Sequence, residues 1–236
     1  MTRKAIRLFA IVMLLAACSG SDGATDVTIA PDLPVLLATA ADTMGSVDSV
    51  HFTFRLEGAP IFIDDADLVS FQDAEGRFVG PDLADALVTV KAAGVATQIG
   101  AVAFEGETYL TNPFTGGWEP TPPNFGFNPA TLFDPNEGWR PLFDGGLNNV
   151  TYQGLEDIDG QTVYHIRGIG DAARIKVITA TLVDEDTELD IWLSPIDASV
   201  VRVEFDTTLD GAVTSWQLNL DQYGETFTIN RPDIEG

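Results

Sequence analysis

The only thiol in the 236-residue chain belongs to Cys18. Residues 15–17 (Leu-Ala-Ala) come directly before it, and Leu15 is the last residue of an apolar run over 8–15. Three cations lie in residues 3–7, ahead of that run. Cations, then a short apolar core, then small residues are typical of a secretory signal peptide. The run is about half of the ~20 residues that a membrane-spanning helix needs, so we expect a cleaved signal peptide over 1–17.

The residues around Cys18 also suggest a chemical modification. Residues 15–18 (Leu-Ala-Ala-Cys) resemble the lipobox of bacterial lipoproteins. That resemblance implies a lipid thioether on Cys18, cleavage before it, and acylation of the new N-terminus. Stable anchoring takes at least two acyl chains, because one chain binds a membrane only marginally. An ordinary secretory signal with an incidental cysteine is the alternative. Residues 18–31 are small and polar, which predicts a lipidated flexible linker.

Few other residues suggest catalysis. His51 and His165 are the only imidazoles, and each lies mid-strand among apolar neighbours, which favours a structural role. The acidic stretch 157–160 (Asp-Ile-Asp-Gly) lacks the ligand spacing of an EF-hand and is typical of a hairpin turn. The chain lacks the H-E-x-x-H, G-x-S-x-G and P-loop motifs. We therefore expect no catalytic residue, metal or cofactor, although 36 acidic residues leave a hydrolytic carboxylate pair open.

The charge of the chain narrows the range of partners. Twelve Lys and Arg stand against 36 Asp and Glu, a formal net charge of −24. Three of those cations precede Cys18, so the processed chain has nine cations and a net charge of −27. Such a chain repels phosphates, which excludes nucleic acid as a partner and disfavours binding to an anionic membrane through a basic face.

The apolar patterning predicts mostly strands after one helix. Asp32 and Pro34 are suited to begin a helix, and alternation over 50–56 then predicts a half-buried strand. Short strands with glycine turns follow. One of these strands, over 68–72, is expected to turn at residues 74–76, and another is expected to close the chain at 227–229.

Two regions interrupt the expected strands. The proline- and aromatic-rich segment 113–128 is either a lid over a pocket or a long loop packed on the body. Two short helices are expected within 128–144, and Asp171 is suited to cap another.

The order of these elements resembles the LppX/LprA/LprF/LprG lipoproteins of actinobacteria. Those proteins begin with a lipobox, then a helix, then a Ser-x-His-aromatic strand, which matches the stretch 37–52 and its end at Ser49–Phe52. Further similarity lies in the segments 106–110, 127–143, 190–205 and 223–232. The resemblance implies one α+β domain over 32–236. Its fold would be a large curved antiparallel β-sheet, a half-barrel of about ten strands, with helices packed on the concave face around a hydrophobic cavity.

The function implied by the resemblance is binding of an acylated lipid or glycolipid and its carriage across the cell envelope. Expected partners are that ligand, the membrane through lipidated Cys18, and a membrane lipid exporter. The expected place is the outer face of the cytoplasmic membrane, or an outer membrane in a host that has one. The residues expected to face the cavity are apolar and lie on strands or short helices: Phe52, Phe54, Val88, Val90, Phe104, Leu132, Phe133, Leu142, Phe143, Ile191, Val203 and Phe205. Plain core packing is the alternative for each of them.

Two other functions stay open at this point. One is a tethered interaction or scaffold protein with a filled core and no lipid ligand, whose acidic surface suits a basic partner. The other is an envelope hydrolase, which requires a carboxylate pair or a histidine with a shifted pKa in a cleft. The volume of an apolar cavity separates the carrier from the first of these.

Overall fold

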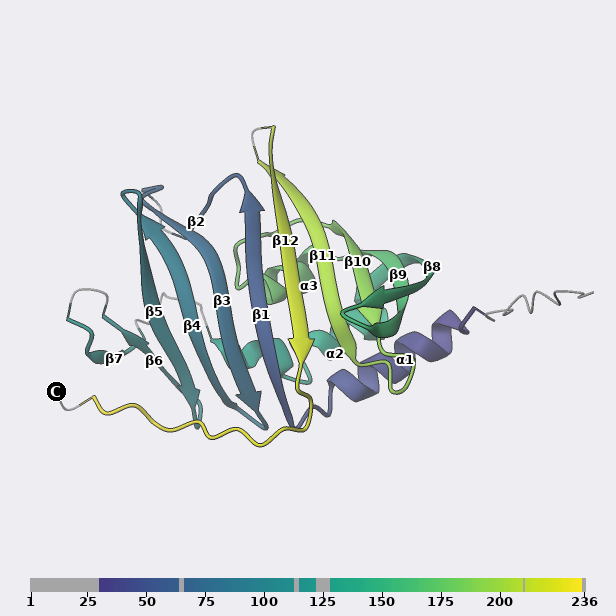
Figure 1. The fold of residues 1–236 in the computed structure, drawn as a ribbon, viewed down its shortest axis with the longest axis horizontal. Helices are drawn as coiled ribbons and strands as arrows, with labels where there is room; N and C mark the ends of the chain where they lie inside the picture. Colours follow the sequence, from purple (N-terminus) through teal and green to yellow (C-terminus); the bar gives the residue numbers. More distant parts are fainter. Residues whose placement is uncertain (1–29, 64–65, 113–114, 122–127, 210, 235–236) are drawn as a thin grey trace, which may run out of the picture.

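A computed structural model describes residues 30–63, 66–112, 115–121, 128–209 and 211–234. One antiparallel sheet of 12 strands forms the body of the molecule, and it is not closed into a barrel (Figure 1). The strand order is β7-β6-β5-β4-β3-β1-β12-β11-β10-β9-β8, with β2 paired to β3. The expected large antiparallel sheet is confirmed, with two strands more than expected.

The strands are mostly 10 to 12 residues long. Their bounds are β1 Ser49–Gly58, β2 Ile61–Phe62, β3 Val69–Val79, β4 Leu83–Ala92, β5 Val95–Phe104, β6 Glu107–Thr111, β7 Trp118–Pro120, β8 Leu147–Ile158, β9 Gln161–Gly170, β10 Thr187–Leu193, β11 Val200–Leu209 and β12 Ala212–Asp221.

The centre of the sheet joins the two ends of the fold. Strand β1 pairs with β3 on one side and with the last strand, β12, on the other, as in Phe54 opposite Ala74 and Leu218. Strands β3 to β7 therefore extend from β1 in one direction, and β11 to β8 extend from β12 in the other. The N-terminal and C-terminal halves share one continuous hydrophobic core through this central pair.

Two helices begin where the sequence predicts, after Asp32 and Asp171, whereas the short helix at Trp139 begins later than the Asp134-Pro135 pair, which is also suited to begin a helix. Helix α1 (Leu33–Met44) is capped by Asp32, whose side chain accepts a hydrogen bond from the backbone N–H of Val35 at 3.2 Å. Asp171 caps α3 (Ala172–Ile178) through the N–H of Arg174 at 2.9 Å. Between β7 and β8 lie a 3₁₀ turn, η1 (Pro129–Phe133), a short α2 (Trp139–Pro141) and a π-type turn, η2 (Leu142–Gly146).

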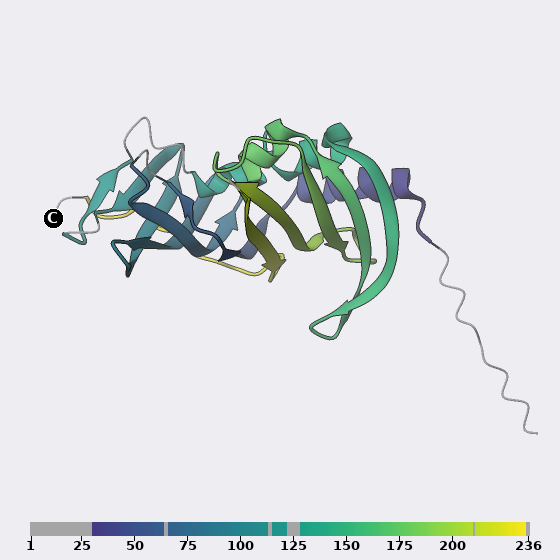
Figure 2. The same cartoon turned by 90° about the horizontal axis from the view of Figure 1, so that it is seen from above.

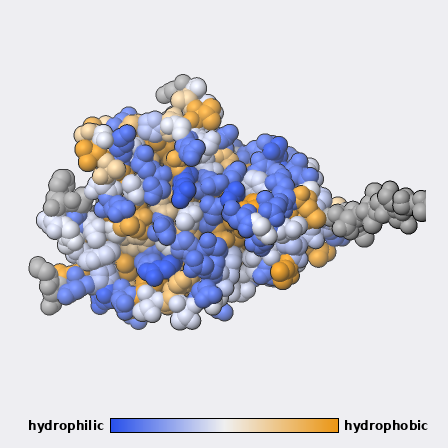
Figure 3. All heavy atoms as spheres, in the orientation of Figure 1, coloured by the Kyte–Doolittle hydropathy of each residue, from blue (hydrophilic) through white to orange (hydrophobic). Residues whose placement is uncertain are grey.

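The two faces of the sheet have opposite character. All of the helices lie on one side of it (Figure 2), and the large apolar side chains of the core, such as Trp139, Leu142 and Ile191, are buried there. The opposite face, called the outer face below, is largely polar. In Figure 3 hydrophilic residues cover much of the view in which β1, β11 and β12 face the reader.

The expected turn at residues 74–76 is wrong, because these residues lie inside β3. The strand continues through them, and Gly76 pairs with Phe52 on β1 and Ala86 on β4. A Cβ atom on Gly76 would lie only 2.5 Å from Cζ of Phe52. This glycine therefore leaves room for a neighbouring aromatic ring and does not bend the chain.

The end of the chain also differs from expectation. Residues 222–234 form no strand; they run along the lower ends of the first-half strands in Figure 1. The Ser49 hydroxyl donates to the carbonyl of Glu225 at 2.7 Å, and Nε of Arg231 donates to the hydroxyl of Tyr109 at 2.8 Å. Ile229 is buried. We call residues 222–234 the C-terminal strap.

One edge of the sheet is irregular. The pairing of β8 with β9 shifts register twice, between Asn148 and Thr151 and between Tyr152 and Gly154. Asn149 and Gly154 have positive φ values of 53° and 140°. Such bulges break the regular ladder and increase the local twist of the strand.

Candidate functional site

An apolar cavity of about 470 Å³ lies between the first half of the sheet and the helices. Its volume falls within the range of about 300–1,000 Å³ that is usual for small-molecule sites. Most of its lining side chains are apolar, and they come from both layers: Phe52, Phe54, Ile63, Phe71, Ala74, Val88, Val90, Ile99, Leu110, Leu132, Val177, Ile178, Ala180 and Leu182.

The strand register sets the floor of the cavity. Val88 lies opposite Ala74 on β3 and Ile99 on β5, so these three side chains share one face. A register shift in β3 between Phe71 and Asp73 keeps Phe71 on the same face, opposite Val90. Because successive residues of a strand alternate between faces, these side chains all point to the side of the sheet on which the cavity lies.

The roof of the cavity is built from η1, α3 and the segment after α3. Asn128 caps η1 by accepting a hydrogen bond from the N–H of Ala130 at 2.9 Å, which fixes the turn that carries Leu132. After α3, Ala180 and Thr181 have φ values of 50° and 73°. A β-branched residue is strained in this left-handed region, and such strain is found at ligand sites.

The polar groups on the cavity lining are few. Six of the twenty lining residues are polar: Asn128, Thr131, Glu137, Lys176, Thr179 and Thr181. The Lys176 ammonium also lies 2.5 Å from a carboxylate oxygen of Asp184, so its charge is balanced within the protein. The cavity therefore offers an apolar body with a small number of polar contacts and no unbalanced cation.

The twelve residues predicted to face the cavity divide into three groups. Five line it: Phe52, Phe54, Val88, Val90 and Leu132. Six lie in the core on the same side of the sheet without lining the cavity: Phe133, Leu142, Phe143, Ile191, Val203 and Phe205.

Phe104 is the exception and requires a correction. The side chains of Ile99, Ala101 and Ala103 face the core, so the alternation of β5 puts Phe104 on the outer face.

Sequence reasoning missed the apolar lining residues on the strands and after β2 (Ile63, Phe71, Ala74, Ile99 and Leu110) and the segment 176–182. Ala74 was missed because a turn was expected at residues 74–76, whereas Phe71 lay in the expected strand 68–72 and was not chosen. The segment 176–182 lacks an alternating pattern; a short helix after Asp171 that carries Ile175 and Ile178 was expected there, but its residues were not chosen for the cavity.

Two predictions depend on residues that the structure leaves undescribed. Cys18 and the rest of residues 1–29 lie outside the described residues, as do 113–114 and 122–127 of the aromatic segment. Within that segment, Trp118 belongs to β7. A Cβ atom on Gly100 would lie 2.8 Å from its ring, so Trp118 packs against β5.

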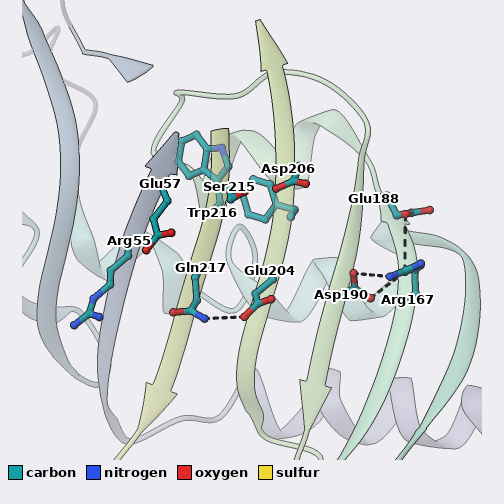
Figure 4. A pocket seen from close by; sticks show the side chains of 11 residues that line it. Arg55, Glu57, Arg167, Glu188, Asp190, Glu204, Asp206, Ser215, Trp216 and Gln217 are labelled. Carbon is teal, nitrogen blue, oxygen red and sulfur yellow. Dashed lines mark hydrogen bonds and ion pairs between the residues drawn. The ribbon is translucent and has the colours of Figure 1, made fainter. Parts of the chain in front are cut away.

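A second cleft, of about 640 Å³, lies on the outer face. Five carboxylates and two arginines line it, and Figure 4 shows these polar side chains arrayed across neighbouring strands. One row crosses five strands in register: Arg167, Asp190, Glu204, Gln217 and Arg55. The Gln217 amide donates to Glu204 at 2.7 Å, and the Arg167 guanidinium binds both oxygens of Asp190 at 2.9 Å.

Each histidine connects three strands on this outer face. His165 on β9 lies 2.7 Å from Glu156 on β8 and 2.6 Å from Asp190 on β10. His51 on β1 is held in the same way, by Asp221 at 2.7 Å and Glu75 at 3.1 Å. Both imidazoles are thus occupied by structural contacts and lie on the face opposite the apolar cavity.

The carboxylates around His165 have shifted pKa values. A hydrogen bond from Trp192 lowers the pKa of Glu156, and the His165 hydrogen bond adds to this against the opposing effect of burial. Burial acts to raise the pKa of Asp190, but hydrogen bonds from Arg167 and His165 outweigh it, so that the pKa is lowered. A general acid in glycoside hydrolysis needs the opposite shift, so this site does not favour a hydrolase.

Two further observations concern the described residues alone. No three of their His, Asp and Glu side chains are grouped so that they could hold a metal ion. None of the helices within them is long and apolar enough to cross a membrane.

Comparison with known proteins identifies the family. The family model described as LppX_LprAFG lipoprotein matches residues 32–229. The chain belongs to the LppX_LprAFG lipoprotein family. The predicted resemblance is thereby confirmed over nearly the whole described fold. A search of curated proteins gave no match.

Solved structures of LppX_LprAFG lipoproteins share the fold. LprF from Mycobacterium bovis is 19% identical with a TM-score of 0.66, and the match covers 86% of this chain and 98% of LprF. LppX from Mycobacterium tuberculosis is 17% identical with a TM-score of 0.58, over 84% of this chain and 98% of LppX. At such identities the likeness establishes the fold, while the cavity described above comes from this chain's own residues.

Proposed function

We propose that this LppX_LprAFG lipoprotein binds an acylated lipid or glycolipid in its apolar cavity and carries it across the cell envelope. The single observation that supports the proposal most is the 470 Å³ cavity with its mostly apolar lining. A scaffold protein has no need of such a space, since filling it would add packing contacts. The absence of nucleophile and phosphate-binding motifs in the sequence agrees with a carrier, because transport needs no bond to break.

The energetics favour a carrier that shields acyl chains. Exposing one methylene to water costs about 0.8 kcal/mol, so a chain of roughly 16 carbons opposes its own escape from a membrane by on the order of 12 kcal/mol. An apolar cavity offers acyl carbons nearly the same environment as a bilayer. A lipid that enters the cavity therefore avoids most of this cost and can cross an aqueous layer.

The anchor belongs to the same proposal. Acylated Cys18, joined to the domain by residues 19–31, would hold the carrier at the membrane that supplies its cargo. A membrane lipid exporter would be the partner that supplies or receives the cargo. Replacement of Cys18 by Ser would release the protein from the membrane fraction and abolish incorporation of labelled palmitate.

The experiment that tests the proposal identifies the cargo directly. The domain would be purified from a lipid-containing host, extracted with organic solvent, and analysed by mass spectrometry. We expect one acylated lipid per protein molecule. Absence of lipid, together with an unchanged melting temperature after addition of diacyl or triacyl lipids, would contradict the proposal and favour an interaction protein.

A matched pair of variants on β4 sharpens this test. Val88→Trp places a large ring in the cavity, whereas Leu87→Trp places the same ring on the outer face, where Leu87 is 45% exposed. We expect Val88→Trp to lower the lipid content at least several-fold and Leu87→Trp to leave it unchanged. Equal lipid content in the two folded variants would contradict the assignment of the cavity as the binding site.

A further inference from the structure

Exposed apolar side chains gather at one end of the sheet. Phe62, Leu68, Val95 and Val213 are 38%, 66%, 68% and 50% exposed. They are four of the nine large apolar side chains that are exposed in the described part of the chain. We call these four residues the apolar rim. Figure 3 shows apolar residues along the upper edge of the molecule, the end at which these strands begin or finish.

The strand register brings the apolar rim together. Val95 is opposite Ala92, which is opposite Val69, the neighbour of Leu68. Phe62 pairs with Ser70 one residue further along β3. Val213 accepts a hydrogen bond at its carbonyl from the N–H of Ala59 at 3.0 Å, at the point where β1 leads towards β2. The four rim residues thus lie in or beside β2, β3, β5 and β12 at one edge of the molecule, and the alternation of β12 puts Val213 on the outer face.

The apolar rim continues the lining of the cavity through Val95. Ile61 and Ile63 lie on the cavity side of the sheet, whereas Phe62 between them pairs with Ser70 and points to the outer face. Val90 lines it two residues before Ala92, and Val95 lies at the end of the β5 row that includes the lining residue Ile99. A mostly apolar row therefore runs from the cavity through Val90, Ala92 and Val95 to the exposed end of these strands.

We propose that the apolar rim inserts into the surface of a lipid bilayer, so that acyl chains move between bilayer and cavity along this row. This inference rests on the proposed lipid-carrier function. Continuity with the cavity favours a bilayer over a protein partner, since only a bilayer supplies what the cavity would hold. The net charge of −24 opposes electrostatic attraction to anionic lipid, so insertion depends on apolar burial, as for interfacial segments in general.

The test measures binding to vesicles. The chain from Asp26 onwards contains the whole described fold with its continuous core, and it lacks Cys18 and the apolar signal segment, so neither can insert. Co-sedimentation with phosphatidylcholine vesicles would compare it with the double variant Val95→Asp, Val213→Asp. The control is Val35→Asp, Ile196→Asp, which adds the same charge at two exposed residues, 61% and 91% accessible, away from the rim.

We expect the rim variant to bind neutral vesicles at least about tenfold more weakly than the parent, because two apolar contacts are lost, while the control binds as the parent does. Circular dichroism spectra of all three proteins would establish that they are folded. Equal binding by rim variant and parent would overturn the proposal, as would an equal loss in the control. Sedimentation would also show whether the parent is a dimer and the rim variant a monomer. That result would mean that the rim contacts a second copy of the chain, and it would overturn the proposal.

The vesicle assay tests the rim proposal, and a second measurement tests the carrier function separately. Lipid content by mass spectrometry would be measured on the same preparations. If the parent carries lipid and the rim variant still binds vesicles fully, the rim proposal fails while the carrier function stands. If no preparation carries or takes up lipid, the carrier function fails, whatever the vesicle assay gives.

Discussion

The ring of His165 stacks on the ring of Trp192, with centroids 4.5 Å apart and an angle of 16° between the planes. Both side chains contact the same carboxylate, because Nε1 of Trp192 donates to Glu156 at 2.8 Å and Nδ1 of His165 lies 2.7 Å from its other oxygen. Asp190 approaches His165 from the opposite side at 2.6 Å. This group joins β8, β9 and β10 on the outer face of the sheet.

The acid stability of the protein depends on this group. The pKa values of Glu156 and Asp190 are lowered from ordinary values of 4.5 and 3.8. A lowered folded-state pKa gives stability that is complete above the unfolded-state pKa and is lost as the pH falls through the folded value. We expect the melting temperature to fall below about pH 4.5, and Asp190→Asn to make that fall shallower. Glu185→Gln, at an exposed carboxylate, is the control and should leave the slope unchanged.

The hydrogen bond from Trp192 can be removed separately. Trp192→Phe keeps an aromatic ring beside His165 but removes the Nε1 donor to Glu156. We expect a loss of about 1 kcal/mol in the free energy of unfolding, measured with urea. The pKa of Glu156, followed by NMR, should rise because its main stabilising donor is gone. An unchanged pKa would contradict this assignment.

Gly76 tests the packing beneath the cavity. In Gly76→Ala the new methyl group would meet Cζ of Phe52 at 2.5 Å and the carbonyl oxygen of Asp85 at 2.2 Å. Overpacking of this kind costs about 1–3 kcal/mol, and displacement of Phe52 would also change the cavity. The same substitution at Gly117, whose nearest contact would be 3.5 Å, should be nearly neutral. Equal effects on thermal unfolding would show that Phe52 moves freely.

The C-terminal strap is expected to stabilise the sheet from outside the main core. Ile229 is 8% exposed on the strap, whereas Ile234 is 43% exposed. Ile229→Ala should lower the free energy of unfolding by about 2 kcal/mol, and Ile234→Ala should change it by less than about 0.5 kcal/mol. Hydrogen exchange should then be faster at β6, where Arg231 binds Tyr109 and Glu107. Unchanged hydrogen exchange at β6 would contradict the prediction that the strap stabilises this strand.

Local patterns predicted much of this fold because their causes are local. Asp32 and Asp171 begin helices through their own side chains. Asp159 and Gly160 turn β8 into β9 with φ values of 54° and 84°, as expected of a tight hairpin turn.

The errors have tertiary causes. Gly76 lies inside β3 because it leaves room for the Phe52 ring on the neighbouring strand. Phe104 lies on the outer face because of the register of β5. Neither cause can be recognised from the sequence of a single strand. Phe227–Ile229 has the composition of a strand but finds no neighbour to pair with.

The cavity was harder to predict than the fold. Alternation indicated which side chains share a face, and five of the twelve chosen residues line the cavity. Whether an inward side chain contacts empty space or another side chain depends on how closely the helices approach. Phe133 illustrates this. Its ring stacks on that of Phe78, with the centroids 4.6 Å apart, so it contacts another side chain and not the cavity.

The broken register of β8 has a consequence for molecules at high local concentration. An open sheet normally presents a free edge on which a second chain can add its own strand and begin a fibre. The left-handed residues Asn149 and Gly154 interrupt the ladder of this edge at two places, so a regular partner strand cannot follow it. Neighbouring copies can therefore be densely packed without polymerising edge to edge at β8.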